Sequence, residues 1–186
     1  MRVPLKLKFY YLLSRLIQKN KTPNFSMDSP REIRDGEEFA LETLKTYLLE
    51  NNINADDLSI KQFPSGYSNL TYFLKSSSEE FVLRRPPFGA KSLQGGHDMF
   101  REYNVLKNLK SQFLKVPDVY LYCDNSEIIG APFYLMERVK GYIIRPNLQQ
   151  KDSPGKEVIQ NVSKSLVSTL VELHNVDIDQ ANLNEL

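Results

Sequence analysis

Residues 61–85 read KQFPSGYSNLTYFLKSSSEEFVLRR, and this stretch decides the fold. Runs of β-branched and aromatic residues are separated by two turn-forming stretches, one around Gly66 and one at the serines 76–78. Such runs bounded by turn residues are typical of strands. The stretch therefore predicts a meander of three antiparallel strands.

The third of these strands carries a cation beside an apolar residue. Side chains alternate along a strand, so Val82 and Arg84 share one face while Phe81, Leu83 and Arg85 share the other. A face of the first kind could hold a flat base next to a chain of phosphates. The glycine turn also offers backbone N–H groups and small hydroxyls to a phosphate, although an ordinary hairpin turn is the alternative interpretation.

Composition limits the classes of function. The 186 residues suffice for one domain with a core, or for a small domain with extra helices. The net charge of +1 conceals an asymmetry, because residues 1–26 hold six basic and no acidic residues and the remainder has a charge of −5. A negative globular part is a poor match for nucleic acid. The single cysteine, Cys123, excludes an internal disulfide and a cysteine-based metal site, and a cytoplasmic setting is expected.

The basic segment 1–26 has three interpretations. It resembles a membrane-surface amphipathic segment, a targeting peptide, or a tail with no structural role. We expect the last of these, so that the segment is poorly ordered and membrane contact is not its function. A functional start at Met27 is a further hypothesis. Apolar runs in the chain fall short of the roughly 18 residues that a spanning helix needs.

Hydrophobic periodicity predicts the remaining elements. Helices are expected over residues 37–51, 98–110 and 153–173, and strands over 119–123 and 132–139, with a turn at 124–126 and Gly130 between those strands. Glu102 lies at the edge of the apolar stripe of the second helix, so it is either solvated or turned inward to meet a cation such as Arg84. Gly141, just after the last strand, marks a natural linker between two lobes.

The order of these features resembles the smaller lobe of the protein-kinase-like fold and, more narrowly, the aminoglycoside phosphotransferase family, which includes choline-kinase-like enzymes. The motifs that carry the resemblance are SGYSN at 65–69, FVLR at 81–84, REYNVL at 101–106, APFYLME at 131–137 with Gly141, and LHNVD at 173–177. The segment FVLRRPP at 81–87 resembles sequences of the family branch that, in animals, is fused to acyl-CoA dehydrogenases and acts on hydroxyacyl substrates.

The resemblance implies an α+β fold. Its expected parts are a five-stranded antiparallel sheet with one packed helix, a linker, and the first helix of a larger lobe. In domain terms these are a basic extension at 1–26, a helical segment at 27–57, a kinase-like small lobe at 58–141 and the start of the larger lobe at 142–186. His174 would be a structural residue at the end of the last helix.

The resemblance also implies a phosphate-binding side of the site. Ser65, Gly66, Ser68 and Asn69 would form the loop over the phosphates. Arg84 would occupy the place usually held by lysine and touch the α and β phosphates, with Glu102 pairing to it. Arginine keeps the charge of lysine but presents a planar fork with several donors.

The base side of the site would use different residues. Val82 would pack on the adenine and Met136 would line the back of its pocket. The carbonyl of Glu137 and the amide of Val139 would hydrogen-bond the adenine edge, which is a backbone role that constrains the side chains little.

The implied function is ATP-dependent phosphotransfer to a hydroxyl of a small molecule, with ATP and Mg²⁺ as cofactors. The family's His-Gly-Asp loop and metal-binding aspartate belong to the larger lobe, and the 186 residues contain no His-Gly-Asp. We therefore expect a fragment that is inactive alone and has no catalytic or metal-binding residue of its own. The alternative is a truncated nucleotide-binding or interaction module without turnover. The sequence does not name the acceptor.

Overall fold

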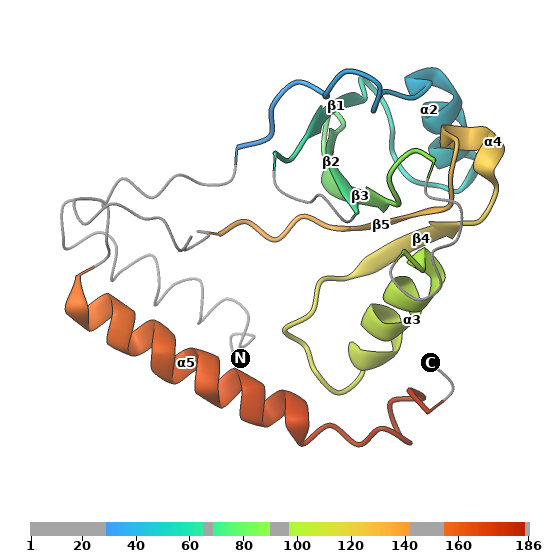
Figure 1. Cartoon of the computed structure of the whole chain (residues 1–186). Coiled ribbons are helices and arrows are strands. Elements are labelled where there is room, and N and C mark those ends of the chain that lie inside the picture. Colours follow the sequence, from blue (N-terminus) through green and yellow to red (C-terminus); the bar gives the residue numbers. More distant parts are fainter. Residues whose placement is uncertain (1–28, 65–68, 90–96, 142–154, 185–186) are drawn as a thin grey trace. The chain divides into compact units, whose positions relative to one another are not determined.

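The computed structural model describes residues 29–64, 69–89, 97–141 and 155–184 (Figure 1). They form two compact units. One contains the described residues among 29–140 together with 169–184, and the other contains residue 141 and residues 155–168. The predicted basic extension at 1–26 and the residues that follow Gly141 in the predicted linker lie outside the described residues.

The larger unit is built around one sheet. Its elements in chain order are α2 (Leu41–Glu50), β1 (Ser59–Gln62), β2 (Leu70–Lys75), β3 (Glu80–Arg85), α3 (Met99–Leu109), β4 (Val119–Cys123), α4 (Ser126–Ile129) and β5 (Phe133–Glu137). The strand order is β1-β2-β3-β5-β4, and every neighbouring pair is antiparallel. The predicted five-stranded antiparallel sheet is confirmed.

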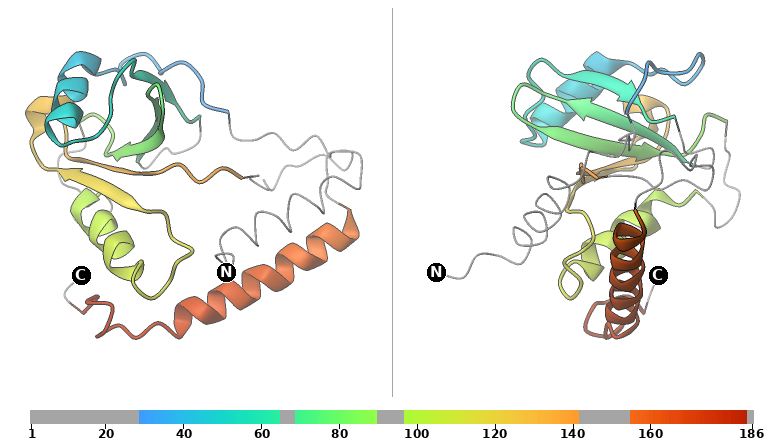
Figure 2. Two further views of the ribbon diagram at one scale, coloured as in Figure 1. Left: turned by 180° about the vertical axis from the view of Figure 1, so that it is seen from behind. Right: turned by 90° about the vertical axis from the view of Figure 1, so that its left-hand side faces the viewer.

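One face of the sheet carries the main core. Leu44 and Leu48 of α2 are fully buried against this face, where Tyr72, Leu83 and Leu135 lie side by side on three neighbouring strands. Figure 2 shows α2 beside this part of the sheet in both views. Burying one leucine side chain contributes about 1.5–3 kcal/mol, so this layer accounts for the position of α2. The predicted alternation of β3 is confirmed, because Phe81 and Leu83 belong to this core.

The opposite face of the sheet is partly covered by α3, which packs against β4 and β5. The helix begins at a side-chain cap, since the carboxylate of Asp98 accepts a hydrogen bond of 2.9 Å from the amide of Arg101. This cap satisfies one of the amides that a helix start leaves without a partner. It also fixes the first turn of α3, which contains Glu102.

The structure adds one short helix to the predicted elements. The segment expected as a turn at 124–126 leads into α4, a helix of four residues. The side chain of Asn125 caps it by accepting from the amide of Glu127, and Gly130 ends it with a φ of 81°. A φ in that region favours glycine because a Cβ would be strained there.

The last helix, α5 (Lys156–His174), begins in the smaller unit and ends in the larger one. Its predicted cap at 153–154 lies outside the described residues. None of the residues of α5 is buried. Within the described ranges, the helices are too short or too polar to cross a membrane.

Candidate functional site

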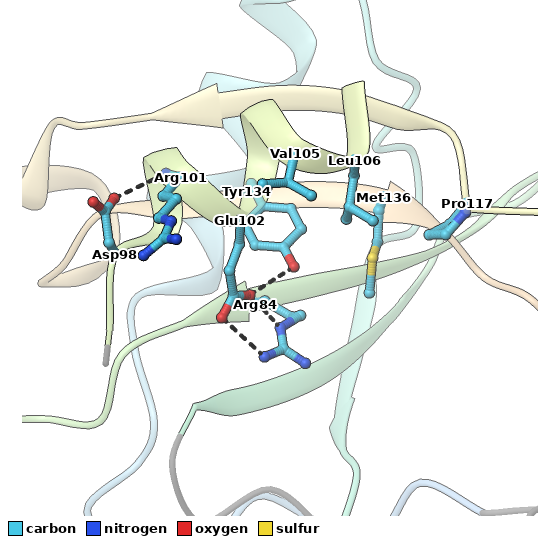
Figure 3. A pocket seen from close by; sticks show the side chains of 9 residues that line it. All are labelled: Arg84, Asp98, Arg101, Glu102, Val105, Leu106, Pro117, Tyr134 and Met136. Carbon is cyan, nitrogen blue, oxygen red and sulfur yellow. Dashed lines mark hydrogen bonds and ion pairs between the residues drawn. The ribbon is translucent and has the colours of Figure 1, made fainter. Parts of the chain in front are cut away.

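Arg84 of β3 and Glu102 of α3 face each other (Figure 3). The Nη2 atom of Arg84 donates a hydrogen bond of 3.4 Å to Oε1 of Glu102, and its Nε atom lies 3.1 Å from Oε2. The buried Nε atom has no well-aligned acceptor among the described residues, so its contact with the carboxylate is electrostatic attraction. The side chains of Arg84 and Glu102 are 29% and 33% exposed. Part of the guanidinium therefore remains open to a ligand.

Two further side chains hold the Glu102 carboxylate in place. The Nδ2 atom of Asn69 donates to Oε1 over 2.7 Å, and the hydroxyl of Tyr134 donates to Oε2 over 2.9 Å. Burial raises the pKa of Tyr134 above its ordinary value, and the nearby carboxylate adds to this effect against the opposing charge of Arg84. The hydroxyl therefore keeps its proton at neutral pH and remains a donor to Glu102.

His97 extends this network by one residue. Its Nδ1 atom lies 2.8 Å from Oδ1 of Asn69. Because the Asn69 nitrogen donates to Glu102, its oxygen must accept, and the proton of the imidazole is assigned to Nδ1. A chain of hydrogen bonds thus runs from His97 through Asn69 to the carboxylate that orients Arg84.

An apolar surface adjoins the ion pair on the same face of the sheet. Val82 lies opposite Phe73 on β2 and opposite Met136 on β5. Val82 and Phe73 are 7% and 8% exposed. Directly opposite residues of antiparallel strands share a face, and Arg84 is two residues from Val82. The cation and the apolar residue predicted to lie together do so.

A pocket of about 520 Å³ opens between this face and α3. Arg84, Glu102 and Met136 line it together with Tyr134 and Arg101 (Figure 3). One edge of the ion pair therefore faces open space.

The structure describes only some of the other predicted site residues. Ser65, Gly66 and Ser68 lie outside the described residues. The side chain of Asn69 is 5% exposed and bonded within the protein, so its amide supports Glu102. Val139, two residues beyond the end of β5, is 58% exposed, while the amide of Glu137 donates to the carbonyl of Asp118 over 2.7 Å.

Sequence reasoning missed Tyr134 and His97 as partners of the site. Tyr134 lies two residues before Met136 on β5, so alternation places both side chains on the same face of the sheet. The register of the β3–β5 pair then brings Tyr134 opposite Arg84, and the sequence alone does not give that register. His97 gives no local signal, because its contact with Asn69 joins residues 28 positions apart. In the described part of the chain, no cluster of three or more His, Cys, Asp or Glu residues could hold a metal ion.

Comparison with known proteins places this chain among phosphotransferases. The profile of the phosphotransferase enzyme family matches residues 59–185. A solved structure described as a candidate aminoglycoside phosphotransferase from Ralstonia eutropha superposes with a TM-score of 0.62 at 25% sequence identity. The match covers 80% of this chain and 42% of the other. The protein-kinase-like fold predicted from the motifs is confirmed.

Several longer proteins contain a similar segment. Acyl-CoA dehydrogenase family member 11 of Rattus norvegicus is 37% identical over 158 residues, which is 82% of this chain and 20% of that protein. Family member 10 of Mus musculus is 30% identical over 164 residues, or 87% and 15% of the two chains. The probable acyl-CoA dehydrogenase IBR3 of Arabidopsis thaliana is 33% identical over 138 residues, or 71% and 16%. The chain thus spans a fifth or less of these relatives.

Proposed function

This chain belongs to the phosphotransferase enzyme family, and from that membership we propose that it is the nucleotide-binding part of an ATP-dependent phosphotransferase that acts on the hydroxyl group of a small molecule. The observation that carries the proposal is the Arg84–Glu102 ion pair, which adjoins the apolar surface of Val82 and Met136. Phosphoryl transfer relies mainly on positioning and charge stabilisation, and a fixed cation beside apolar side chains would supply both on the nucleotide side.

The residues fit ATP at two points. The exposed part of the Arg84 guanidinium would bind phosphate oxygens, since a planar fork of donors matches their geometry. The apolar side chains of Val82 and Met136 would contact the base, whose edge would reach the backbone at Glu137 and Val139. ATP, when bound, supplies the phosphoryl group.

The network around Glu102 supports this role through preorganisation. Asn69 and Tyr134 both donate to the carboxylate, so the carboxylate is fixed before a ligand arrives. A fixed carboxylate limits the rotamers of Arg84, and the cation pays less ordering entropy when phosphate binds. In this scheme Glu102 and its two donors position Arg84 and do not touch the nucleotide.

The described residues do not fit Mg²⁺ in the same way. Magnesium prefers carboxylate oxygens together with phosphate oxygens, and no suitable cluster is present within the described ranges. We propose that the magnesium ligands and the catalytic base lie outside these 186 residues, as in a fragment of a longer enzyme. The 186 residues would then bind ATP without turning it over, which is also the behaviour of the alternative, an inactive nucleotide-binding module.

Replacing Arg84 tests the proposed phosphate contact. We expect Arg84→Met to weaken ATP binding by about tenfold or more, because a hydrogen bond to a charged group contributes roughly 1.5–3 kcal/mol. Binding of adenosine, which has no phosphate, should be unchanged. Isothermal titration calorimetry with ATP, and NMR titration of the ¹⁵N-labelled chain with adenosine, would measure the two affinities.

Arg34→Met is the matched control. Arg34 also pairs with a glutamate, since its Nε atom lies 2.7 Å from Oε2 of Glu37, but it lies outside the residues that line the pocket. This variant should bind ATP as the wild type does. Equal ATP affinity of the wild type and Arg84→Met would overturn the assigned role of Arg84, and absence of ATP binding by the wild type would overturn the proposed function.

A further inference from the structure

The base side of the proposed site contains an aromatic surface. Phe73 lies opposite Val82 on the face of the sheet that carries Arg84. The ring of Phe63, just after β1, meets the ring of Phe73 edge to face with centroids 6.3 Å apart. A flat base that packs on Val82 while its phosphates reach Arg84 would therefore also meet the ring of Phe73.

That ring is already covered by Arg138. The guanidinium carbon of Arg138 lies 4.1 Å from the ring centroid of Phe73 and 6.0 Å from that of Phe63. The first distance is about one van der Waals contact, so a base cannot enter between the guanidinium and the Phe73 ring. A planar guanidinium stacks on an aromatic ring much as a base does, and the two would compete for the same surface.

A carboxylate on the neighbouring strand holds Arg138 in this position. The Nη1 atom of Arg138 lies 3.3 Å from Oε2 of Glu80, the first residue of β3. Lys140 reaches the same oxygen atom over 2.7 Å. The hydrogen bond from Lys140 lowers the pKa of Glu80 below its ordinary value despite partial burial, so this carboxylate is anionic at neutral pH. The side chain of Arg138 is 16% exposed.

We propose that Arg138 is a displaceable cap on the base site, held over Phe73 by Glu80 and removed when the base of the nucleotide stacks. This inference rests on the proposed function and deepens it. Arg138 directly precedes Val139, so the cap is part of the same segment that is expected to meet the edge of the base. Because the capped state excludes the base, only molecules in which the ring is free can bind it. The apparent affinity for the base is therefore the intrinsic affinity multiplied by the fraction of molecules with a free ring. The Arg138–Glu80 pair thus sets nucleotide affinity without contacting the phosphates.

Adenosine is the suitable probe, because it has the base but no phosphate charge that Arg138 could attract. We expect Arg138→Ala to bind adenosine more tightly than the wild type, on the order of threefold to tenfold, which is the range that loss of one cation–π contact corresponds to. Glu80→Gln should give part of the same increase, because it releases Arg138 without removing it. NMR titration of the ¹⁵N-labelled chain would measure the dissociation constants.

Lys140→Ala is the matched control. Lys140 contacts the same Glu80 oxygen, so its removal changes the charge by the same amount while leaving Arg138 on the ring. Adenosine affinity should not rise in this variant. The cap is refuted if Arg138→Ala binds adenosine with unchanged or lower affinity while Arg84→Met still weakens ATP binding. If ATP binds to neither the wild type nor any variant, the proposed function fails and the cap fails with it.

Discussion

Two adjacent arginines show how position decides the role of one residue type. Arg84 faces the pocket, whereas Arg85 is completely buried on the opposite face of β3. The Nη1 atom of Arg85 donates to the carbonyl of Ile129 over 2.6 Å, and its guanidinium lies 3.6 Å from the ring centroid of Phe88. Burial lowers the pKa of Arg85, but an arginine still remains charged at neutral pH. Arg85 therefore links β3 to the end of α4, whereas Arg84 lines the pocket.

Asn69 is the residue that best separates positioning from direct binding. Asn69→Ala removes the donor to Glu102 and the acceptor for His97, so Arg84 should lose part of its orientation. We expect ATP affinity to fall severalfold while adenosine affinity is retained. The free energy of unfolding should also fall by about 1–3 kcal/mol, because buried polar partners are left unsatisfied. Calorimetry with ATP and urea denaturation would measure the two effects.

Asn108→Ala is the control for this prediction. Asn108 is a residue of α3 whose side chain, like that of Asn69, donates to a distant segment, in this case to the carbonyl of Asn182. Asn108 does not line the pocket. ATP affinity should be the same as in the wild type. A normal ATP affinity in Asn69→Ala would show that Arg84 does not depend on this support.

At the scale of elements, the sequence predicts those features that depend on residues close together in the chain. The two faces of β3 follow from alternation. The predicted start of α3 at Asp98 is confirmed to within one residue, because Asp98 is the N-terminal cap of the helix. The helix α4 was missed because its four residues are too few to show a helical period. Tyr134 was missed for a different reason. Its role depends on the β3–β5 register, which joins strands about fifty residues apart and is fixed by the whole sheet.

The cap of α3 should affect both stability and binding. Asp98→Ala removes the acceptor for the Arg101 amide, and loss of such a cap costs about 0.5–2 kcal/mol. Glu102 lies in the first turn that this cap fixes, so fraying of that turn should also weaken ATP binding. Asn125→Ala removes the comparable cap of α4, which is remote from the pocket, and should reduce stability alone. Equal ATP affinities in the two variants would contradict the coupling of α3 to the site.

At the scale of the whole chain, α5 differs from the other long helices. It has 19 residues, and apolar side chains recur along it at helical spacing. Leu166 and Leu170 are 67% and 49% exposed, whereas α2 and α3 each contain buried residues. Helices in proteins draw most of their stability from packing of such a face. The chain spans only 42% of the candidate aminoglycoside phosphotransferase that it resembles, and we propose that the apolar stripe of α5 packs on a surface outside the described residues.

This proposal predicts that the isolated chain associates with itself through α5. Large exposed apolar surfaces drive association, so sedimentation velocity should show the average mass rising with concentration. Leu166→Glu combined with Leu170→Glu places two charges on the apolar stripe and should shift the chain toward monomer. Asn161→Glu combined with Ser168→Glu adds two charges on another face of the same helix and should leave the association intact. A single monomeric species of the unmodified chain at every concentration would mean that α5 needs no partner, and would favour a self-sufficient nucleotide-binding module over a fragment.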